Sequence, residues 1–299
     1  MSRVTAQPGI FAQGAAEHAF LELDLRDGAA VGDLLTALAG LTSGAAGLSS
    51  VGVVVGVRPS LLGDVVSVPE GAADFADDIV GPDGFRMPAT QHDAFVWLAA
   101  ANRTSVYDNG VAVLSALTSV ATVATGLDGW PYKHNRDLTG FVDGTENPSP
   151  LEAVDVAATP DGAAVVLFQK WTHDRAAWGA LSDDQQSKVI GRSKADDVEI
   201  ADDVQSPDAH VPRNVIEEDG EELAILRRNV AYGGVTDHGT VFIGFCADQR
   251  VLARMLSRMA GVEDGIRDAL TRYTAPVSGA YYVCPSVEDL AKHAPPEDD

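Results

Sequence analysis

Cysteine is scarce in this sequence of 299 residues, which contains only Cys246 and Cys284, each in an apolar stretch with the pattern of a strand. Two cysteines cannot form a framework of several disulfides, and they are too few for a cysteine-rich metal site. We therefore expect both side chains to be buried thiols.

Long apolar runs are also missing. No stretch approaches the roughly 20 apolar residues that a helix needs to cross a bilayer. The start, MSRVTAQPGIFAQG, lacks the charged and then apolar blocks of a secretory signal. We therefore expect a soluble, cytoplasmic protein without a membrane partner.

Basic residues are few relative to acidic ones. The chain has 21 Lys and Arg against 44 Asp and Glu, which gives a formal net charge of -23. Proteins bind phosphate backbones with clustered Lys and Arg, and a field of this sign repels nucleic acid. Nucleic acid is therefore excluded as a partner, while a hydrophobic content of 45% is enough for a sizeable core.

The pattern of apolar residues predicts two successive blocks of strands and helices. The first block has strands at 19–25 and 49–57, a helix between them with leucines on one face, a strand from 94 to 101 and a helical pattern from 109 to 123. The second block has a strand at 162–173, a helix at 182–192 capped by Ser182, a long loop from about 193 to 220, neighbouring strands at 222–230 and 239–247, and a helix at 249–261.

This order predicts an α+β fold with two ferredoxin-like domains, each an antiparallel β-sheet with helices packed on it, in an arrangement like a dimeric α+β barrel. The expected domains are residues 1–148 and 149–299. No internal repeat of fixed period supports the duplication, so it depends on the order of the elements alone.

The stretch GFVDGTENPSP at 140–150 places two glycines, an Asp, a Glu and an Asn between apolar neighbours. Gly140 and Gly144 would let backbone amides approach a ligand closely, and Asp143 would be a carboxyl able to transfer a proton. An ordinary Asp-Gly turn followed by Asn-Pro explains the same residues. The spacing alone leaves both interpretations open.

A second polar group lies in LRRNV at 226–230, on a predicted strand. Alternate residues of a strand share a face, so Arg227 and Asn229 would point one way and Arg228 the other. An Arg on a buried face needs a partner, and an anion, a carboxylate or a bound oxygen species would suit Arg227. An edge-strand Arg paired to a surface acid is the alternative.

His210 lies late in the long predicted loop, in the segment SPDAHVPRN. No second metal ligand stands at a spacing of HxH or HxxxH from it. A haem requires a single axial ligand, whereas zinc sites need three or four. A structural or exposed histidine is the alternative, and the lack of a CxxCH motif means that any haem would be held without thioether bonds.

Together these stretches resemble the dye-decolourising peroxidase family. GFVDGTENP is similar to the GxxDG signature of that family, SPDAHVPRN to the segment with the proximal histidine, and LRRNVAYG to the strand with the distal arginine. The three motifs occur in the order of the family and at similar intervals, and the two-block pattern covers nearly the whole chain. The resemblance is strongest to the compact, bacterial class B members.

The resemblance implies one haem b per chain, with His210 as the ligand of the iron. It places Asp143 and Arg227 above the haem as catalytic residues, with Asn229 in the same network. Glu146 falls in the signature loop, which in the family lies along the edge of the haem, and we expect it to contact the cofactor.

Family members also tie the proximal histidine to an acid. Asp268, in GIRDALTRY, looks like that acid, although Glu263 and Asp264 lie one turn away and are alternatives. A carboxylate on the second ring nitrogen would make His210 a stronger donor to iron.

The implied activity is that of a haem peroxidase, in which hydrogen peroxide drives the oxidation of dyes, phenols or other one-electron donors through a high-valent haem intermediate. The implied partners are therefore hydrogen peroxide and small reductants, within a homo-oligomer. Three alternatives remain open: a deferrochelatase-like or chlorite dismutase-like enzyme on the same fold, a non-catalytic haem carrier, and a ferredoxin-like module without haem.

Overall fold

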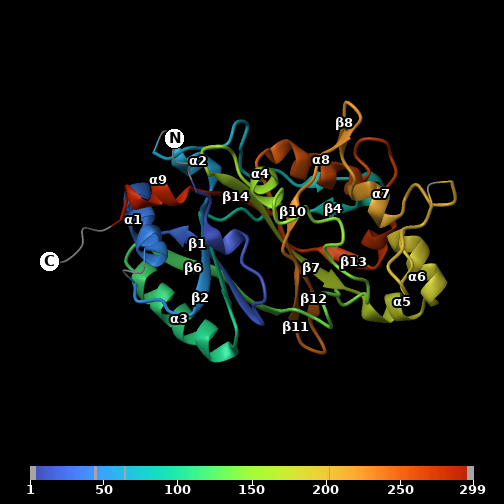
Figure 1. Ribbon diagram of the computed structural model, residues 1–299, viewed down its shortest axis with the longest axis horizontal. Helices are drawn as coiled ribbons and strands as arrows, with labels where there is room; N and C mark the ends of the chain where they lie inside the picture. The colour runs from blue at the N-terminus through green and yellow to red at the C-terminus, as the bar shows by residue number, and fades with distance from the viewer. Residues whose placement is uncertain (1–4, 44–45, 64, 202, 295–299) are drawn as a thin grey trace.

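The computed structural model describes residues 5–43, 46–63, 65–201 and 203–294. Among these residues ten strands form one antiparallel sheet, and eight of them close into a barrel (Figure 1). Closure occurs because β12 (His238–Cys246) pairs with β7 (Ala164–His173) as well as with β11 (Val230–Gly233). The expected α+β class is confirmed.

The first half of the barrel has the strand order β6-β1-β5-β2, covered by α1 and α3. Its main elements are β1 (Glu17–Leu25), α1 (Val31–Thr42), β2 (Val51–Val57), β5 (Ala94–Ala100), α3 (Arg103–Leu117) and β6 (Ala121–Trp130). Short elements accompany them: η1 (Pro8–Ile10), α2 (Pro59–Leu62), β3 (Ile79–Val80), η2 (Pro82–Gly84) and β4 (Arg86–Met87).

The second half has the strand order β14-β7-β12-β11. In both halves the fourth strand of the half therefore lies beside its first, followed by its third and its second. Besides β7, β11 and β12, this half comprises α4 (Ala153–Ala157), α5 (Arg175–Gly179), α6 (Asp183–Ile190), α7 (His210–Asn214), β8 (Glu217–Glu218), β9 (Glu221–Glu222), β10 (Leu226–Arg227), α8 (Gln249–Ala260), η3 (Ala269–Arg272), β13 (Thr274–Pro276), β14 (Ala280–Cys284) and α9 (Val287–Ala291).

The strands bury their two faces in different cores because alternate side chains point to opposite sides. Inside the barrel, Phe20, Trp97, Phe168 and Phe245 belong to one cluster. Outside the first half, leucines of α1 pack against valines of β2 and β5, and outside the second half α8 packs against β7. The barrel is therefore the middle layer of the molecule, with helices on both of its outer sides (Figure 1).

Three local predictions were wrong. Residues 121–123, expected at the end of a helix, begin β6, whose many exposed side chains and two glycines hide its strand pattern. The long loop after α6 contains the short helix α7, which has no side-chain cap and includes Pro212. The single strand expected at 222–230 is divided into β10 and β11 around Arg228 and Asn229.

Two further expectations, on Ser182 and on the cysteines, are confirmed. Ser182 caps α6 and accepts a hydrogen bond from the backbone N–H of Gln185. Both cysteines are buried and free. In the part of the chain that the structure describes, no helix is both long and apolar enough to span a membrane.

Candidate active site

A large cavity lies between the outer face of β7 and β12 and the helices α7 and α8, with the loop at 137–146 along one side. Its volume is about 1410 Å³, part of which is open to solvent. Its apolar lining includes Phe141, Ile190, Val211, Phe242, Val251, Met255, Leu256, Met259 and Leu270. A cavity with an apolar wall and a few polar side chains is typical of a site for a large, flat ligand.

His210 is the first residue of α7 and points into this cavity. Its Nδ1 lies 2.7 Å from Oδ2 of Asp268, whose side chain is fully buried. The other oxygen of Asp268 accepts a hydrogen bond from the backbone N–H of Leu270 and caps η3. The aspartate is therefore held at both oxygens, and it fixes the orientation of the imidazole ring.

The helix that carries His210 is fixed to α8 through Arg213, which is 3% exposed. Its guanidinium donates to both carboxylate oxygens of Asp264, at 2.7 and 2.9 Å, and to the backbone carbonyl of Arg258. Asp264, an alternative partner of His210 in the sequence, is thus paired with Arg213. Glu263, the other alternative, lies near Arg254 instead.

The pKa of His210 reflects opposing effects. Burial lowers it, but the charge of Asp268 and the hydrogen bond to it raise it, and the net result is a pKa above the ordinary value.

Asn214, one turn further along α7, donates to the His210 carbonyl oxygen at 2.6 Å, and its amide nitrogen also lies near both ring nitrogens.

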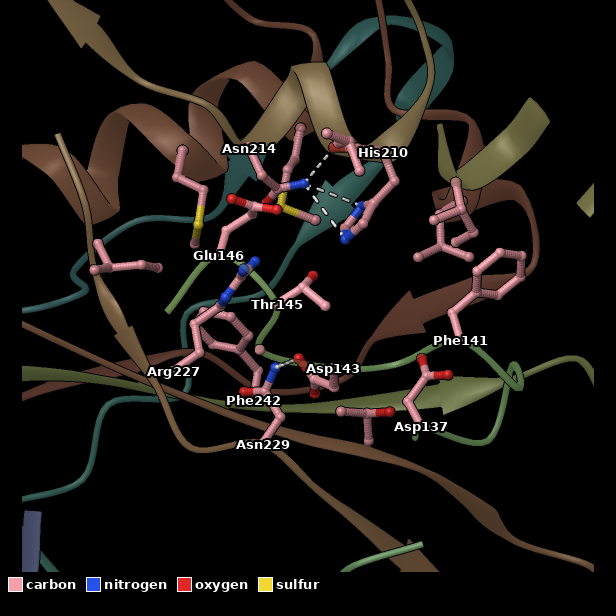
Figure 2. Close-up of a pocket in the computed structure, with 18 of the residues that line it drawn as sticks. Asp137, Phe141, Asp143, Thr145, Glu146, His210, Asn214, Arg227, Asn229 and Phe242 are labelled. Atoms are coloured by element: carbon pink, nitrogen blue, oxygen red, sulfur yellow. Dashed lines mark hydrogen bonds between the residues drawn. The ribbon is translucent and has the colours of Figure 1, made fainter. Parts of the chain in front are cut away.

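Across the cavity from His210 lie Asp143, Arg227 and Asn229, as Figure 2 shows. Asn229 donates a hydrogen bond from Nδ2 to Oδ1 of Asp143 at 3.2 Å, and its own Oδ1 accepts one from the backbone N–H of Ile243. The Asn229 side chain therefore takes a place in the β-ladder, which explains why the predicted strand is interrupted there.

Arg227 lies on β10 and lines the cavity, and its Nε is buried without a hydrogen-bond partner among the described residues. Its backbone N–H and C=O are both bonded to the side chain of Asn147, at 2.7 and 2.9 Å. Because Arg227 lines the cavity, its unpartnered Nε–H is available to a group bound there.

Glu146 lines the mouth of the cavity, and its side chain is 47% exposed. One of its oxygens lies 2.6 Å from Nη1 of Arg192, which also faces Asp197 and Glu199. The structure therefore brings Glu146 to the same cavity as the other predicted residues, but pairs it with an arginine.

Asp137 also lines the cavity, although it was not among the residues predicted from the sequence. Burial, together with the nearby charge of Asp143, raises its pKa to about 6, against the opposing hydrogen bonds from Thr139 and the charge of His210. Asp137 lies six residues after Pro131 and belongs to no motif, and only the position of the loop over the cavity desolvates its carboxyl group.

The two glycines of the signature loop have a local function. Gly140 and Gly144 have φ angles of 95° and 82°, which favour glycine because other residues rarely adopt them. A Cβ atom on Gly144 would lie 2.8 Å from Nδ2 of Asn147. At this position the glycine thus leaves room for the Asn147 carboxamide, and Gly144 itself lines the cavity.

Residues 134–289 match the family model described as "Dyp-type peroxidase, C-terminal". A dye-decolorizing peroxidase from Mycolicibacterium paratuberculosis is 39% identical over 213 residues, which cover 68% of this chain and 60% of that protein. The chain therefore spans less than two thirds of the length of this relative.

Solved structures are similar over nearly the full chain. DypB from Rhodococcus jostii RHA1 has a TM-score of 0.88 and 34% identity, and the match covers 97% of this chain and 98% of that one. A variant of the same DypB in complex with heme matches with a TM-score of 0.87, again at 34% identity, over 97% of this chain and 98% of that one.

Proposed function

The chain belongs to the Dyp-type peroxidase family, and we propose on this basis that it is a haem peroxidase that uses hydrogen peroxide to oxidise dyes, phenols or other one-electron donors. One observation carries the proposal: a histidine bound to a buried aspartate faces an Asp, an Arg and an Asn across a large cavity with apolar walls.

The residues of the cavity fit one haem b per chain. Among the described residues no three His, Cys, Asp or Glu side chains are grouped to hold a metal ion. A haem iron needs only one axial ligand from the protein, which His210 would supply. The apolar walls suit a flat macrocycle, and the unpartnered Nε of Arg227 suits an anion or an oxygen species. When bound, the haem supplies the iron that reacts with peroxide and then accepts electrons from the reductant.

His210 is the proposed ligand of the iron, through Nε2, since Nδ1 faces Asp268. The carboxylate of Asp268 keeps Nδ1 as the hydrogen-bonded nitrogen and increases the electron density on the ring. Asp268 thus supports cofactor binding indirectly, because it holds the imidazole ring of His210.

Asp143 and Arg227 are the proposed catalytic pair on the opposite side. Asp143 accepts a proton from the inner oxygen of hydrogen peroxide and delivers it to the outer oxygen, which leaves as water. Arg227 stabilises the negative charge that develops on the departing oxygen. Asn229 holds the Asp143 carboxylate through the bond at 3.2 Å.

Glu146 is proposed to lie at the edge of the cofactor, near the mouth of the cavity. The ion pair with Arg192 supports this position, because it holds the Glu146 side chain beside the pocket. Reductants reach this edge from solvent.

The matching strand orders of the two halves support two ferredoxin-like domains, at 1–148 and 149–299. We also propose a location in the cytoplasm and a homo-oligomeric assembly, both suggested by the family resemblance. The family model is described as a Dyp-type peroxidase and the relative named above as a dye-decolorizing peroxidase, which favours this function over a deferrochelatase-like enzyme or a haem carrier.

The deciding experiment is the ultraviolet-visible spectrum of the haem-reconstituted protein before and after one equivalent of peroxide, for the wild type and for His210→Ala. We expect a Soret band that shifts on addition of peroxide in the wild type and that is weakened or lost in the variant. A wild-type protein that stays colourless would exclude haem binding, and a coloured protein inert to peroxide would indicate a carrier.

A further inference from the structure

The strand edge at Arg227 is paired by a side chain in place of a strand. β10 lies at one end of the sheet and is bonded to β12 on its inner side. On its outer side the carboxamide of Asn147 accepts a hydrogen bond from the Arg227 N–H and donates one to the Arg227 C=O. One amide group therefore satisfies both backbone polar groups of Arg227, as a residue of a neighbouring strand would.

We propose that Asn147 is a positioning residue, which fixes the backbone of Arg227 and thereby directs its guanidinium to the peroxide side of the cavity. The inference rests on the proposed function, because Arg227 is the residue through which Asn147 acts.

The loop around Asn147 is shaped to present this carboxamide. The backbone N–H of Asn147 donates to the carbonyl oxygen of Gly144 at 3.1 Å and closes a turn. A side chain on Gly144 would collide with Nδ2 of Asn147, the atom that donates to Arg227. The glycine and the asparagine of the signature loop are thus parts of one contact.

A second asparagine joins the same two segments in the opposite direction. Asn147 extends from the loop to the backbone of Arg227, and Asn229 extends from the strand region to the carboxylate of Asp143. The two proposed catalytic groups, Asp143 and Arg227, are therefore held at a fixed separation by a pair of reciprocal amide contacts.

The guanidinium group of Arg227 shows why the hydrogen bonds of Asn147 to the Arg227 backbone are important. Its Nε has no hydrogen-bond partner among the described residues. Arg213, by contrast, is held at its guanidinium by Asp264 and by a backbone carbonyl. When the guanidinium group has no partner in the protein, its orientation depends on the position of the backbone. Such a group is effective because its geometry is preorganised.

A double-mutant cycle tests the inference in the haem-loaded protein. We expect Asn147→Ala to lower the second-order rate constant for reaction with peroxide about tenfold, and Arg227→Leu to lower it by about a hundredfold or more. Because Asn147 acts through Arg227, adding Asn147→Ala to Arg227→Leu should cause no further loss. A wild-type rate in Asn147→Ala, or a full tenfold loss in the Arg227→Leu background, would overturn the inference.

Asn102→Ala is the matched control. Asn102 caps α3 in the first half of the barrel, and its side chain also accepts a hydrogen bond from a backbone N–H, that of Ser105, at 2.9 Å. The substitution removes a hydrogen bond between a side chain and the backbone far from the cavity, so we expect the rate constant for reaction with peroxide to stay at the wild-type value. An equal loss in both variants would show that Asn147 contributes stability alone.

Hydrogen exchange of the Arg227 backbone amide gives a measurement that does not depend on activity. We expect Asn147→Ala to lose protection at this amide and Asn102→Ala to keep it, because only Asn147 accepts its hydrogen bond. Unchanged protection in Asn147→Ala would contradict the inference. If the wild type fails to react with peroxide, the proposed function fails, and the exchange result still decides whether Asn147 holds Arg227.

Discussion

The two halves of the barrel share one strand order, but they cover their outer faces differently. In the first half, α1 and α3 lie directly on the sheet, and the leucines of α1 that face it are fully buried. In the second half, α8 covers part of the sheet and α7 stands away from it, which leaves the cavity over β7 and β12. The difference is in the helices, and not in the sheet.

This difference explains why the polar chemistry is confined to one half. A polar side chain on a sheet face that is covered by apolar helices would be buried without partners, at a cost of about 1–3 kcal/mol or more. Over β10 and β12 the cavity leaves room for a bound group beside Arg227 and Asn229. A site of this kind therefore requires a gap between the layers.

The largest effect on the rate of reaction with peroxide should come from replacing the polar side chains of the cavity. We expect Arg227→Leu to slow the reaction with peroxide by roughly 10²–10³-fold, because it removes the charge that stabilises the departing oxygen. Asp143→Ala should slow it less. Stopped-flow rate constants of the two variants in the reverse order would contradict this ranking.

Removal of a buried apolar side chain should lower the free energy of unfolding by different amounts in the two halves of the barrel. Leu38 of α1 is fully buried against the sheet and does not border the cavity, so we expect Leu38→Ala to lower the free energy of unfolding by about 3 kcal/mol. Met255, 2% exposed, borders the cavity, and Met255→Ala should cost clearly less because it enlarges an existing space. Urea denaturation of both variants measures the difference, and equal losses would show that the second half is packed as tightly as the first.

A buried base in the first half should make stability depend on pH. Burial, and then the charge of Arg228, lower the pKa of His18 to about 4, and Nδ1 of His18 accepts a hydrogen bond from the indole of Trp97. The unfolded chain binds a proton near pH 6.5 and the folded chain near pH 4, so stability is present above pH 6.5 and is lost as the pH falls toward 4. The 2.5-unit difference corresponds to about 3 kcal/mol at most.

His18→Asn keeps an acceptor near Trp97 but does not titrate in this range. We expect the free energy of unfolding of this variant to decline less than that of the wild type between pH 6.5 and 4.5. Parallel declines of the two proteins would exclude His18 as the cause.

Asp137, an acid in the loop over the cavity, should act in the opposite direction, with a smaller effect. The pKa of Asp137 is raised to about 6, so its contribution to stability is present below pH 4 and is lost as the pH rises through 6. Asp137→Asn should therefore stabilise the protein more at pH 7 than at pH 4.5. The same gain at both pH values in urea denaturation would argue against a raised pKa.

The parts of the fold that the sequence predicts are those with a regular apolar period. The helix with Leu34 and Leu38 and the strand at 162–173 follow from such periods, and the structure has them nearly as expected. The strand β6 was missed because side chains on both of its faces are largely exposed, so it lacks the alternation that predicts a half-buried strand.

The site was predicted less completely, for a different reason. Asp143, Arg227 and His210 lie in distinct motifs, and Asn147 lies in the same motif as Asp143, but the sequence does not indicate its contact, and Asp137 lies in no motif. The carboxamide of Asn147 bonds to a backbone 80 residues away, and the burial of Asp137 depends on a loop folded over the second half. Contacts between segments that are distant in the chain leave no periodic mark in a single sequence.

The loop with Asp143 and Asn147 has a consequence for the order of events during synthesis. It follows the last strand of the first half, yet it docks on strands and helices of the second, and Asp143 precedes Asp268 by 125 residues. At roughly 5–20 residues per second, translation separates these two side chains by roughly 6–25 s. During that interval the first half can fold while the loop has no surface on which to dock, so cofactor loading must wait until the ribosome has made both walls of the cavity.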